Sequence, residues 1–394
     1  MNEINIASAR IRLPVAGGKF AEYRLSQPRH FPTRSALPFN RIAYAAAHVV
    51  SDPLAAMNPW QDCAIDWAAT IDYRCRLWQL GLGVAEAMDT AQRGMGMDWP
   101  TSLELIRRSI DAAQDFPGAL LASGAGTDQL SPADARSLDD VIRAYEEQLA
   151  AIEKLGGRIV LMASRALARI ATSPDDYHRV YERILSQVSQ PVIIHWLGEM
   201  FDPALAGYWG FADHVQAMNV CLDICNRHAA KVDGVKVSLL DKDKEIAMRR
   251  RLASGVRMYT GDDFNYAQLI AGDEAGYSDA LLGIFDAIAP AAAAALTALA
   301  AGERGAFDEI LAPTVALSRH IFTAPTRFYK TGVVFMAYLN GRQSHFTMVG
   351  AEQGARSLLH LSELFRLADQ AGLLCDPDLA CSRMRAVLAV HGVI

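Results

Sequence analysis

The stretch Val232-Asp-Gly-Val-Lys-Val-Ser238 is a short apolar run with one lysine, Lys236, near its centre. Gly234 opens the run, and the polar segment 240–245 follows it. Strand-forming residues on both sides would carry Lys236 into the protein interior, where an ammonium group must be paired or must lose its charge. A lysine with a lowered pKa is a nucleophile that can form a Schiff base with a carbonyl compound. The stretch therefore predicts a buried strand and suggests a class of reaction.

Outward from this stretch, segments of strand type and of helical type alternate along the chain. We predict strands at 42–50, 83–88, 118–123, 158–163, 191–196, 232–238, 256–260 and 276–281. Helical patterns lie between them, near 62–79, 101–114, 137–154, 175–188, 214–229, 242–253 and 264–271. This alternation is typical of parallel βα units, and a closed (β/α)8 barrel needs about 250 residues. We therefore predict an α/β fold, a (β/α)8 TIM barrel over residues 41–289.

The chain extends beyond the predicted barrel on both sides. Residues 8–25 have the pattern of a β-hairpin around the Gly17-Gly18 turn, and a Pro-containing connection continues to Asn40. After Pro290 the pattern is helical, at 290–301, 304–321, 328–340 and 354–372. We predict three regions: an N-terminal hairpin and connection at 1–40, the barrel at 41–289 and a C-terminal helical extension at 290–394.

Composition excludes several classes of protein. The chain has 394 residues, of which 51% are hydrophobic, and a formal net charge of -6, so no basic surface points to nucleic acid. The six cysteines lack the paired spacing of a zinc site. The longest apolar run, 288–301, is alanine-rich and too short to span a bilayer, and the N-terminus lacks the pattern of a signal peptide. We expect a cytoplasmic protein that binds neither membranes nor nucleic acid.

A barrel of this type places its chemistry at the carboxyl ends of the strands. Lys236 and Ser238 end the sixth predicted strand, and His195 ends the fifth. The other candidates follow the second, fourth and seventh strands; they are Glu86, Asp89, Thr90, Gln92, Arg165, Gly261 and Asp262. We predict that Lys236 and His195 are catalytic and that the remaining residues bind substrate.

The sequence around Lys236 resembles a known family. Gly234-Val-Lys-Val-Ser238 is similar to the Schiff-base lysine strand of the dihydrodipicolinate synthase / N-acetylneuraminate lyase superfamily of class I aldolases. Tyr259-Thr-Gly-Asp-Asp263 resembles the Gly-Asp-Asp motif of its seventh strand, Ser123–Thr127 its Gly-x-Gly turn, and Lys330–Val333 its lysine-bearing helix. The likeness is collinear over roughly 41–341 and suggests an outlying, uncharacterised dihydrodipicolinate-synthase-like branch. It implies a lyase without a cofactor that forms a homodimer or homotetramer.

The departures from the family change the expected substrate. Where the family holds a substrate carboxylate with a Gly-Thr-Thr-Gly-Glu loop, this chain has the acidic stretch Glu86–Gln92. Acidic side chains repel a carboxylate, so pyruvate is disfavoured. His195 stands where the family has a proton-relaying tyrosine, and histidine can perform the same transfer. We expect a polyhydroxylated keto compound, a keto sugar or sugar-acid derivative, whose hydroxyl groups bind to Glu86, Asp89 and Gln92.

Other interpretations of the same residues stay open. Glu86, Asp89, His195 and Asp262 could instead hold a divalent metal ion in a sugar isomerase or epimerase, with Lys236 stabilising an enolate. A catalytically inactive barrel that binds a ligand is a third possibility. Structural roles also compete: Lys236 could pair with Asp262, either aspartate could cap the following helix, and the strand-2 carboxylates could pair with Arg93.

Overall fold

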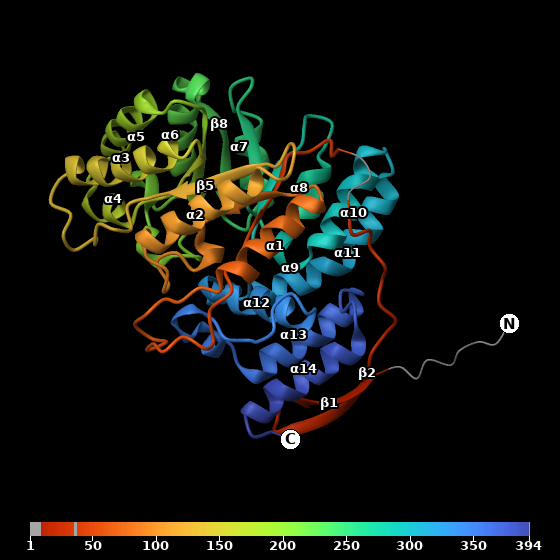
Figure 1. Ribbon diagram of the computed structural model, residues 1–394. Helices are drawn as coiled ribbons and strands as arrows, with labels where there is room; N and C mark the ends of the chain where they lie inside the picture. The colour runs from red at the N-terminus through yellow and green to blue at the C-terminus, as the bar shows by residue number, and fades with distance from the viewer. Residues whose placement is uncertain (1–8, 35–37, 394) are drawn as a thin grey trace.

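The computed structural model describes residues 9–34 and 38–393 (Figure 1). Within these residues eight parallel strands form a closed barrel, hydrogen-bonded in the order β10-β3-β4-β5-β6-β7-β8-β9. The strands are β3 (Ala43–Ala46), β4 (Gly83–Glu86), β5 (Leu121–Ala125), β6 (Arg158–Leu161), β7 (Val192–Leu197), β8 (Val232–Ser238), β9 (Arg257–Thr260) and β10 (Asp279–Leu282). The sequential order confirms the predicted (β/α)8 barrel.

Helices that follow the strands cover the outside of the barrel (Figure 1). They are α1 (Trp67–Gln79), α2 (Trp99–Ala113), α3 (Leu138–Lys154), α4 (Arg165–Ile170), α5 (Pro174–Gln187), α6 (His214–Arg227), α7 (Lys242–Arg249), α8 (Tyr266–Ala271) and α9 (Ile284–Ala287). For several of these helices, the residues at the N-terminal end determine where the helix begins. The Asp66 and Asp98 carboxylates accept the free amides of α1 and α2, and Ser137 forms a capping box with Asp140 at α3.

The predicted hairpin and helical extension are also present. Strands β1 (Arg10–Val15) and β2 (Lys19–Arg24) pair antiparallel. The extension consists of α10 (Ala289–Ala300), α11 (Arg304–Ile321), α12 (Tyr329–Leu339), α13 (Leu358–Gln370) and α14 (Pro377–Val390). Figure 1 shows the hairpin beside α13 and α14, where the Tyr23 hydroxyl donates to Asp369. Every residue of α12 is buried, so this helix joins the extension to the barrel.

Residues 1–8, which carry the expectation about a signal peptide and the first residue of the predicted hairpin, lie outside the described residues. The first barrel strand is shorter than the predicted 42–50. The amides of His48 and Val50 bond to the Asp286 carboxylate and the Thr70 hydroxyl instead of a neighbouring strand, so the ladder ends at Ala46. Among the described helices, none is long and apolar enough to cross a membrane.

The pleat of the strands determines which side chains enter the barrel. Its interior is filled by a buried cluster of Tyr44, Ala46, Ala85, Met88, Ala122, Val160, Ile193, Tyr259 and Leu281. Successive strand residues point to opposite faces. Because Ile193 points inward, so does His195 two residues later, and His195 lies in register with Lys236 of β8. Because Ala85 points inward, Glu86 points outward toward the helices.

Candidate active site

Lys236 occupies the interior of the barrel near the carboxyl ends of the strands. Its neighbours in register are His195 on β7 and Tyr259 on β9. The residue is only 5% exposed, and within the described residues its Nζ makes no hydrogen bond and no ion pair shorter than 4 Å. Burial lowers the pKa of Lys236, while the more distant charges of Asp89 and Asp263 act in the opposite direction. The amine is therefore easier to deprotonate than an exposed lysine, as a carbonyl nucleophile requires.

Asp89 is the carboxylate whose negative charge acts on the Lys236 amine. It begins the short 3-10 helix η1 (Asp89–Ala91) after β4, and its Oδ2 accepts the Tyr329 hydroxyl at 2.8 Å. The same hydroxyl lies 2.6 Å from the Thr90 Oγ1. Burial opposes ionisation of Asp89, but the positive charges of Lys330 and Lys236 outweigh it, so the pKa of Asp89 lies below its ordinary value. An ionised carboxylate thus acts electrostatically on the amine where an iminium cation would form.

His195 and Ser238 form the opposite wall of the site. The His195 Nε2 lies 3.2 Å from the Ser238 Oγ, and its Nδ1 has no hydrogen-bond partner among the described residues. Burial, followed by the charge of Lys236, lowers the pKa of His195 well below its ordinary value. The imidazole is therefore neutral at physiological pH and has a free ring nitrogen. A neutral imidazole in this position can exchange a proton with a bound molecule.

Gly261 leaves the room that Lys236 occupies. A Cβ added at Gly261 would lie 2.8 Å from the Lys236 Cε, 2.2 Å from the Ser238 Oγ and 2.8 Å from the Val237 carbonyl oxygen. Only the lysine and serine side chains could move, because the carbonyl belongs to the strand ladder. We predicted that Gly261 binds substrate. The structure instead gives this residue a steric role, because the absence of a side chain leaves room for Lys236 and Ser238.

We expect Gly261→Ala to displace Lys236 and to lower the rate of adduct formation with a ketone by at least about tenfold. The overpacking should also cost about 1–3 kcal/mol in the free energy of unfolding. The rate is measured by cyanoborohydride reduction and intact-mass analysis, and stability by urea titration. Gly305→Ala is the matched control, because a Cβ there meets nothing within 4 Å. Equal rates for both variants would contradict the steric role.

Asp263, and not Asp262, faces the lysine. The Asp262 carboxylate accepts the amides of Phe264 and Asn265 and the Asn265 side chain, so it caps the turn that leads into α8. Asp263 is buried, accepts the Ile284 amide at 2.8 Å and has a pKa raised by burial to about 8. The structure corrects the prediction for Asp262, because strand alternation turns it away from Lys236.

Glu86 is a structural residue outside the barrel interior. Its two carboxylate oxygens receive Nε and Nη2 of Arg74, each at 2.9 Å. The Ser109 hydroxyl and the Ala87 amide bond to the same carboxylate. These contacts tie β4 to α1 and α2 and leave no access for a ligand. The structure thus corrects the prediction that Glu86 holds substrate.

Gln92 and Thr90 also take internal roles. The Gln92 Nε2 donates to the carbonyl oxygens of Val349 and Met95, so the side chain fastens the turn after β4 to the C-terminal extension. Gln92 is buried and is not among the residues that line the cavity described below, while its Oε1 has no hydrogen-bond partner among the described residues. Thr90 bonds to Tyr329 behind Asp89 and supports the carboxylate from that side.

The predicted metal ligands do not converge. Among the described residues, no group of three or more His, Cys, Asp and Glu side chains is arranged to hold a metal ion. Glu86 and Asp262 point away from the barrel interior that contains Asp89 and His195. The alternative prediction of a metal site built from these four residues is therefore wrong, for the same reason that Glu86 and Asp262 fail as substrate ligands.

Two functional residues come from the C-terminal extension and were missing from the predicted site. Tyr329 bonds to Asp89, and Lys330 is a second buried lysine, 3% exposed, whose Nζ donates to the Arg327 carbonyl at 2.9 Å. Burial lowers the pKa of Lys330. The signal in the sequence is weak but present: Tyr329 and Lys330 open a helix that continues with the apolar run 333–339.

A cavity of about 280 Å³ opens beside this cluster. It lies at the ends of β4 to β7 and is lined by Asp89, Thr127, Asp128, Arg165, Asp202 and, on its apolar side, Met162 and Leu197. Leu197 is two residues beyond His195 on the same strand. Asp89, whose charge acts on the buried Lys236, lines the cavity, and so does Arg165, one of the residues predicted to bind substrate. Lys236 and His195 themselves are not among the lining residues.

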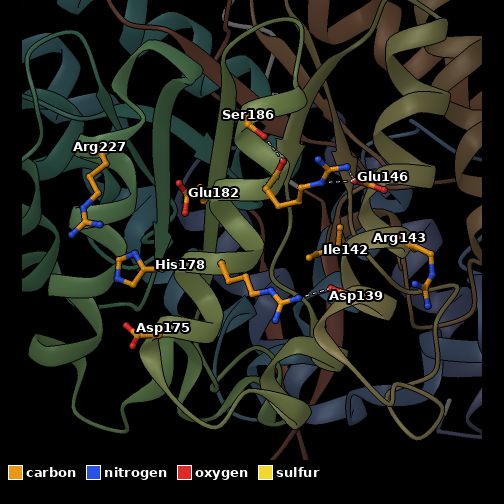
Figure 2. Close-up of a pocket in the computed structure, with 11 residues that line it drawn as sticks. Asp139, Ile142, Arg143, Glu146, Asp175, His178, Glu182, Ser186 and Arg227 are labelled. Atoms are coloured by element: carbon orange, nitrogen blue, oxygen red, sulfur yellow. Dashed lines mark hydrogen bonds and ion pairs between the residues drawn. The ribbon is translucent and has the colours of Figure 1, made fainter.

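A larger cavity, of about 880 Å³, lies on the outer surface and is a less suitable site. Figure 2 shows that it is lined by side chains of the surface helices α3, α5 and α6. Its arginines are already paired, Arg179 with Asp139 and Arg183 with Glu146. No barrel strand contributes to it, so we place the candidate active site in the smaller cavity beside Asp89.

Comparisons with known proteins agree with this architecture. YagE, a prophage protein of the dihydrodipicolinic acid synthase family from E. coli K12 solved with pyruvate, is 13% identical, with a TM-score of 0.65 over 85% of this chain and 99% of that chain. Dihydrodipicolinate synthase from Acinetobacter baumannii, complexed with pyruvate, is 16% identical (TM-score 0.61; 84% and 99% covered). The enzyme from Oceanobacillus iheyensis is 14% identical (TM-score 0.61; 83% and 96% covered).

These likenesses establish the fold and confirm the resemblance seen in the sequence. A family model described as a protein of unknown function, DUF993, matches residues 11–393. A search of curated proteins finds no significant match. The structural comparisons, at 13–16% identity, show that the chain has the fold of the dihydrodipicolinate synthase structures.

Proposed function

Because the chain belongs to the family DUF993, whose model spans residues 11–393, and folds as a dihydrodipicolinate-synthase-like barrel, we propose that it is a lyase that forms a Schiff base through Lys236. The observation that carries the proposal is the buried, unpaired amine of Lys236 beside an ionised Asp89 and a neutral His195. Carbonyl chemistry needs these three groups together: a nucleophile, a counter-charge and a proton carrier.

The proposed reaction begins when the neutral Lys236 Nζ attacks the carbonyl carbon of a ketone. The carbinolamine that results loses its hydroxyl group, with a proton, as water and becomes an iminium cation. Asp89 offsets the iminium charge, and the Tyr329 hydroxyl bonded to it can deliver a proton to the departing oxygen. Removal of the proton of the hydroxyl on the β-carbon turns that carbon into a carbonyl group and breaks the bond between the α- and β-carbons. The electron pair of this bond moves into the iminium to give an enamine, and the β-carbon fragment leaves as an aldehyde. Protonation and hydrolysis release the shortened ketone and the free lysine.

His195 is the group proposed to remove and return the proton. Its unpartnered Nδ1 and the low pKa of its imidazole mean that it is available as a base without prior deprotonation. The proposed substrate is a small hydroxylated keto compound, a keto sugar or a sugar-acid derivative. Glu86, Gln92 and Asp262 form hydrogen bonds within the protein. Asp89 and Thr127 line the cavity and can bind hydroxyl groups of the substrate.

The proposal is tested by reductive trapping. The protein is incubated with a panel of hydroxylated ketones and cyanoborohydride, and the intact mass is measured. An increase that matches one reduced imine per chain supports the proposal. No adduct with any compound of the panel, including one that the protein turns over, would contradict it.

We expect adduct formation to accelerate with pH and to reach half its maximal rate well below the ordinary pKa of lysine. Only the neutral amine attacks, and burial lowers the pKa of Lys236, so the neutral form becomes abundant at lower pH. Initial trapping rates between pH 5.5 and 10.5 check this expectation. A rate that begins to rise only above pH 10 would show that Lys236 behaves as an ordinary surface lysine.

A further inference from the structure

Arg165 presents unused hydrogen-bond donors to the cavity. It is the first residue of α4, and its side chain is 40% exposed. Its Nε bonds to the Asp202 carboxylate at 2.5 Å, whereas Nη1 and Nη2 have no acceptor within the described part of the chain. Asp202 is itself fixed, because its other oxygen accepts the Ala204 amide. The guanidinium group is thus oriented by one contact while its outer face stays free.

Gly94 makes space for this guanidinium. A Cβ added there would lie 2.9 Å from the Arg165 Nη1, and the residue has a φ of +71°, which disfavours any side chain. Both Gly94 and Arg165 line the cavity. The close approach holds the free Nη groups at the cavity wall.

Arg93 lines the same cavity, but its N–H groups are already hydrogen-bonded within the protein. Its Nε and Nη2 bond to the two oxygens of Asp128 at 3.1 and 2.7 Å. Its Nη2 also bonds to Gln148, and its Nη1 to the Gly124 carbonyl. The guanidinium of Arg93 therefore stabilises the loop after β5. Arg165 is the arginine of the cavity that can receive an anion.

The size and polarity of the cavity indicate the size and charge of the ligand that it can hold. At about 280 Å³ the cavity lies near the lower end of the range of about 300–1,000 Å³ that is typical of small-molecule sites. The polar groups that line it include Asp89, whose charge acts on Lys236, and the pair Arg165 and Asp202. Apolar side chains, among them Leu130, Met162 and Leu205, line it as well. Lys236 is not among the lining residues, so a ligand that reaches it from this cavity would pass Asp89 while its far end stays near Arg165.

We propose that Arg165 binds a carboxylate or phosphate group at the far end of the substrate, so that the substrate is an anionic hydroxy ketone and not a neutral sugar. A planar guanidinium with two free nitrogen atoms binds either oxyanion through paired hydrogen bonds. The acidic stretch after β4 does not oppose this placement, because Glu86 faces outward and Asp89 lies at the lysine end. The inference rests on the proposed function and narrows its substrate class.

Three ketones test the inference by cyanoborohydride trapping: neutral fructose, fructose 6-phosphate and 5-ketogluconate. We expect at least one anionic ketone to reach half-maximal adduct at a concentration about tenfold or more below that of fructose. Arg165→Gln should raise that concentration about tenfold to hundredfold and leave fructose unchanged. The anion with the larger dependence on Arg165 identifies the group as carboxylate or phosphate.

Two matched variants test whether the effect on anion binding is specific to the Arg165 guanidinium. Arg169→Gln, on the same helix but outside the cavity, should behave as wild type, and Arg165→Lys should give an intermediate effect because it keeps the charge without the planar fork. An equal anion preference in wild type and Arg165→Gln, or none in wild type, overturns the inference while leaving the Schiff base intact.

A second measurement separates this inference from the proposed function. Lys236→Ala can form no imine, so thermal stabilisation of this variant by inorganic phosphate or malonate reports the anion site alone. Stabilisation that disappears in Lys236→Ala/Arg165→Gln supports the site even if no ketone is trapped. If no ketone is trapped and neither anion stabilises Lys236→Ala, the inference and the proposed function both fail.

Discussion

Replacing Lys236 by methionine is expected to abolish ketone adduct formation and, at the same time, to stabilise the fold. Lys236 is fully enclosed and lacks a close ionic partner, so its protonated form is costly in the folded state. A methionine of similar length removes that cost, and such replacements stabilise proteins by about 1–4 kcal/mol. Loss of the amine should reduce turnover by at least about a thousandfold. Adduct mass and urea unfolding measure the two effects.

The gain in stability from Lys236→Met should depend on pH. The folded-state pKa of Lys236 is depressed, so the unfolded chain binds the extra proton, and wild type loses stability as the pH falls from the ordinary lysine pKa through the lowered one. The variant has no such loss. The difference should therefore be largest at and below neutral pH and should shrink toward pH 10.5. A variant less stable than wild type at pH 7 would indicate that Lys236 is a structural lysine.

Asp89→Asn is expected to have the second-largest effect. Asp89 is the carboxylate whose charge acts on both Lys236 and Lys330, so its removal takes away the counter-charge that they share and leaves only Asp263 for Lys236 and Glu352 and Asp202 for Lys330. We expect a loss of about 3 kcal/mol in the free energy of unfolding at pH 7 and a smaller loss at pH 10, because the lowered pKa values leave a larger share of both amines neutral there. The maximal rate of adduct formation should fall about a hundredfold, because the iminium loses its stabilising charge.

The pH profile distinguishes a catalytic role of Asp89 from a merely structural one. The charge of Asp89 raises the pKa of Lys236, so its removal should shift the rise in trapping rate to lower pH even as the maximal rate falls. Tyr329→Phe is the control, since it removes one hydrogen bond to Asp89 and keeps the charge. It should cost about 1 kcal/mol and lower the maximal rate, because the proposed proton donor is lost, while the midpoint of the pH profile stays near that of wild type. A profile for Asp89→Asn with an unchanged midpoint would contradict the assigned interaction.

The fold was predictable from the sequence because each βα unit has its own local pattern. The apolar stretch at Lys236 and the alternation around it identify eight strands, and closure of a parallel sheet of that size follows from burial of both faces. The exact ends of the strands were harder to predict than their existence. At β3 the ladder stops where the side chains of Asp286 and Thr70 take the amides of His48 and Val50, and these partners are distant in sequence.

The site was predictable only in part because a strand end does not reveal which way a side chain points. Lys236 and His195 lie within strands, where alternation is regular, and both predictions place them inside the barrel. Glu86 ends its strand just before Ala87, whose φ of 50° turns the chain, and its side chain faces Arg74. Tyr329 approaches Asp89 from a helix 240 residues further along the chain, a contact that no local pattern encodes.

The central claim is that Lys236, and no other lysine, forms the imine. The most direct test is peptide mapping by mass spectrometry after cyanoborohydride reduction with an accepted ketone. Lys330 provides the strict comparison, because it is also buried and also close to Asp89. We predict that the reduced adduct lies on the peptide containing Lys236 and that the peptide containing Lys330 remains unmodified. An adduct on Lys330, or one spread over surface lysines, would contradict the assignment.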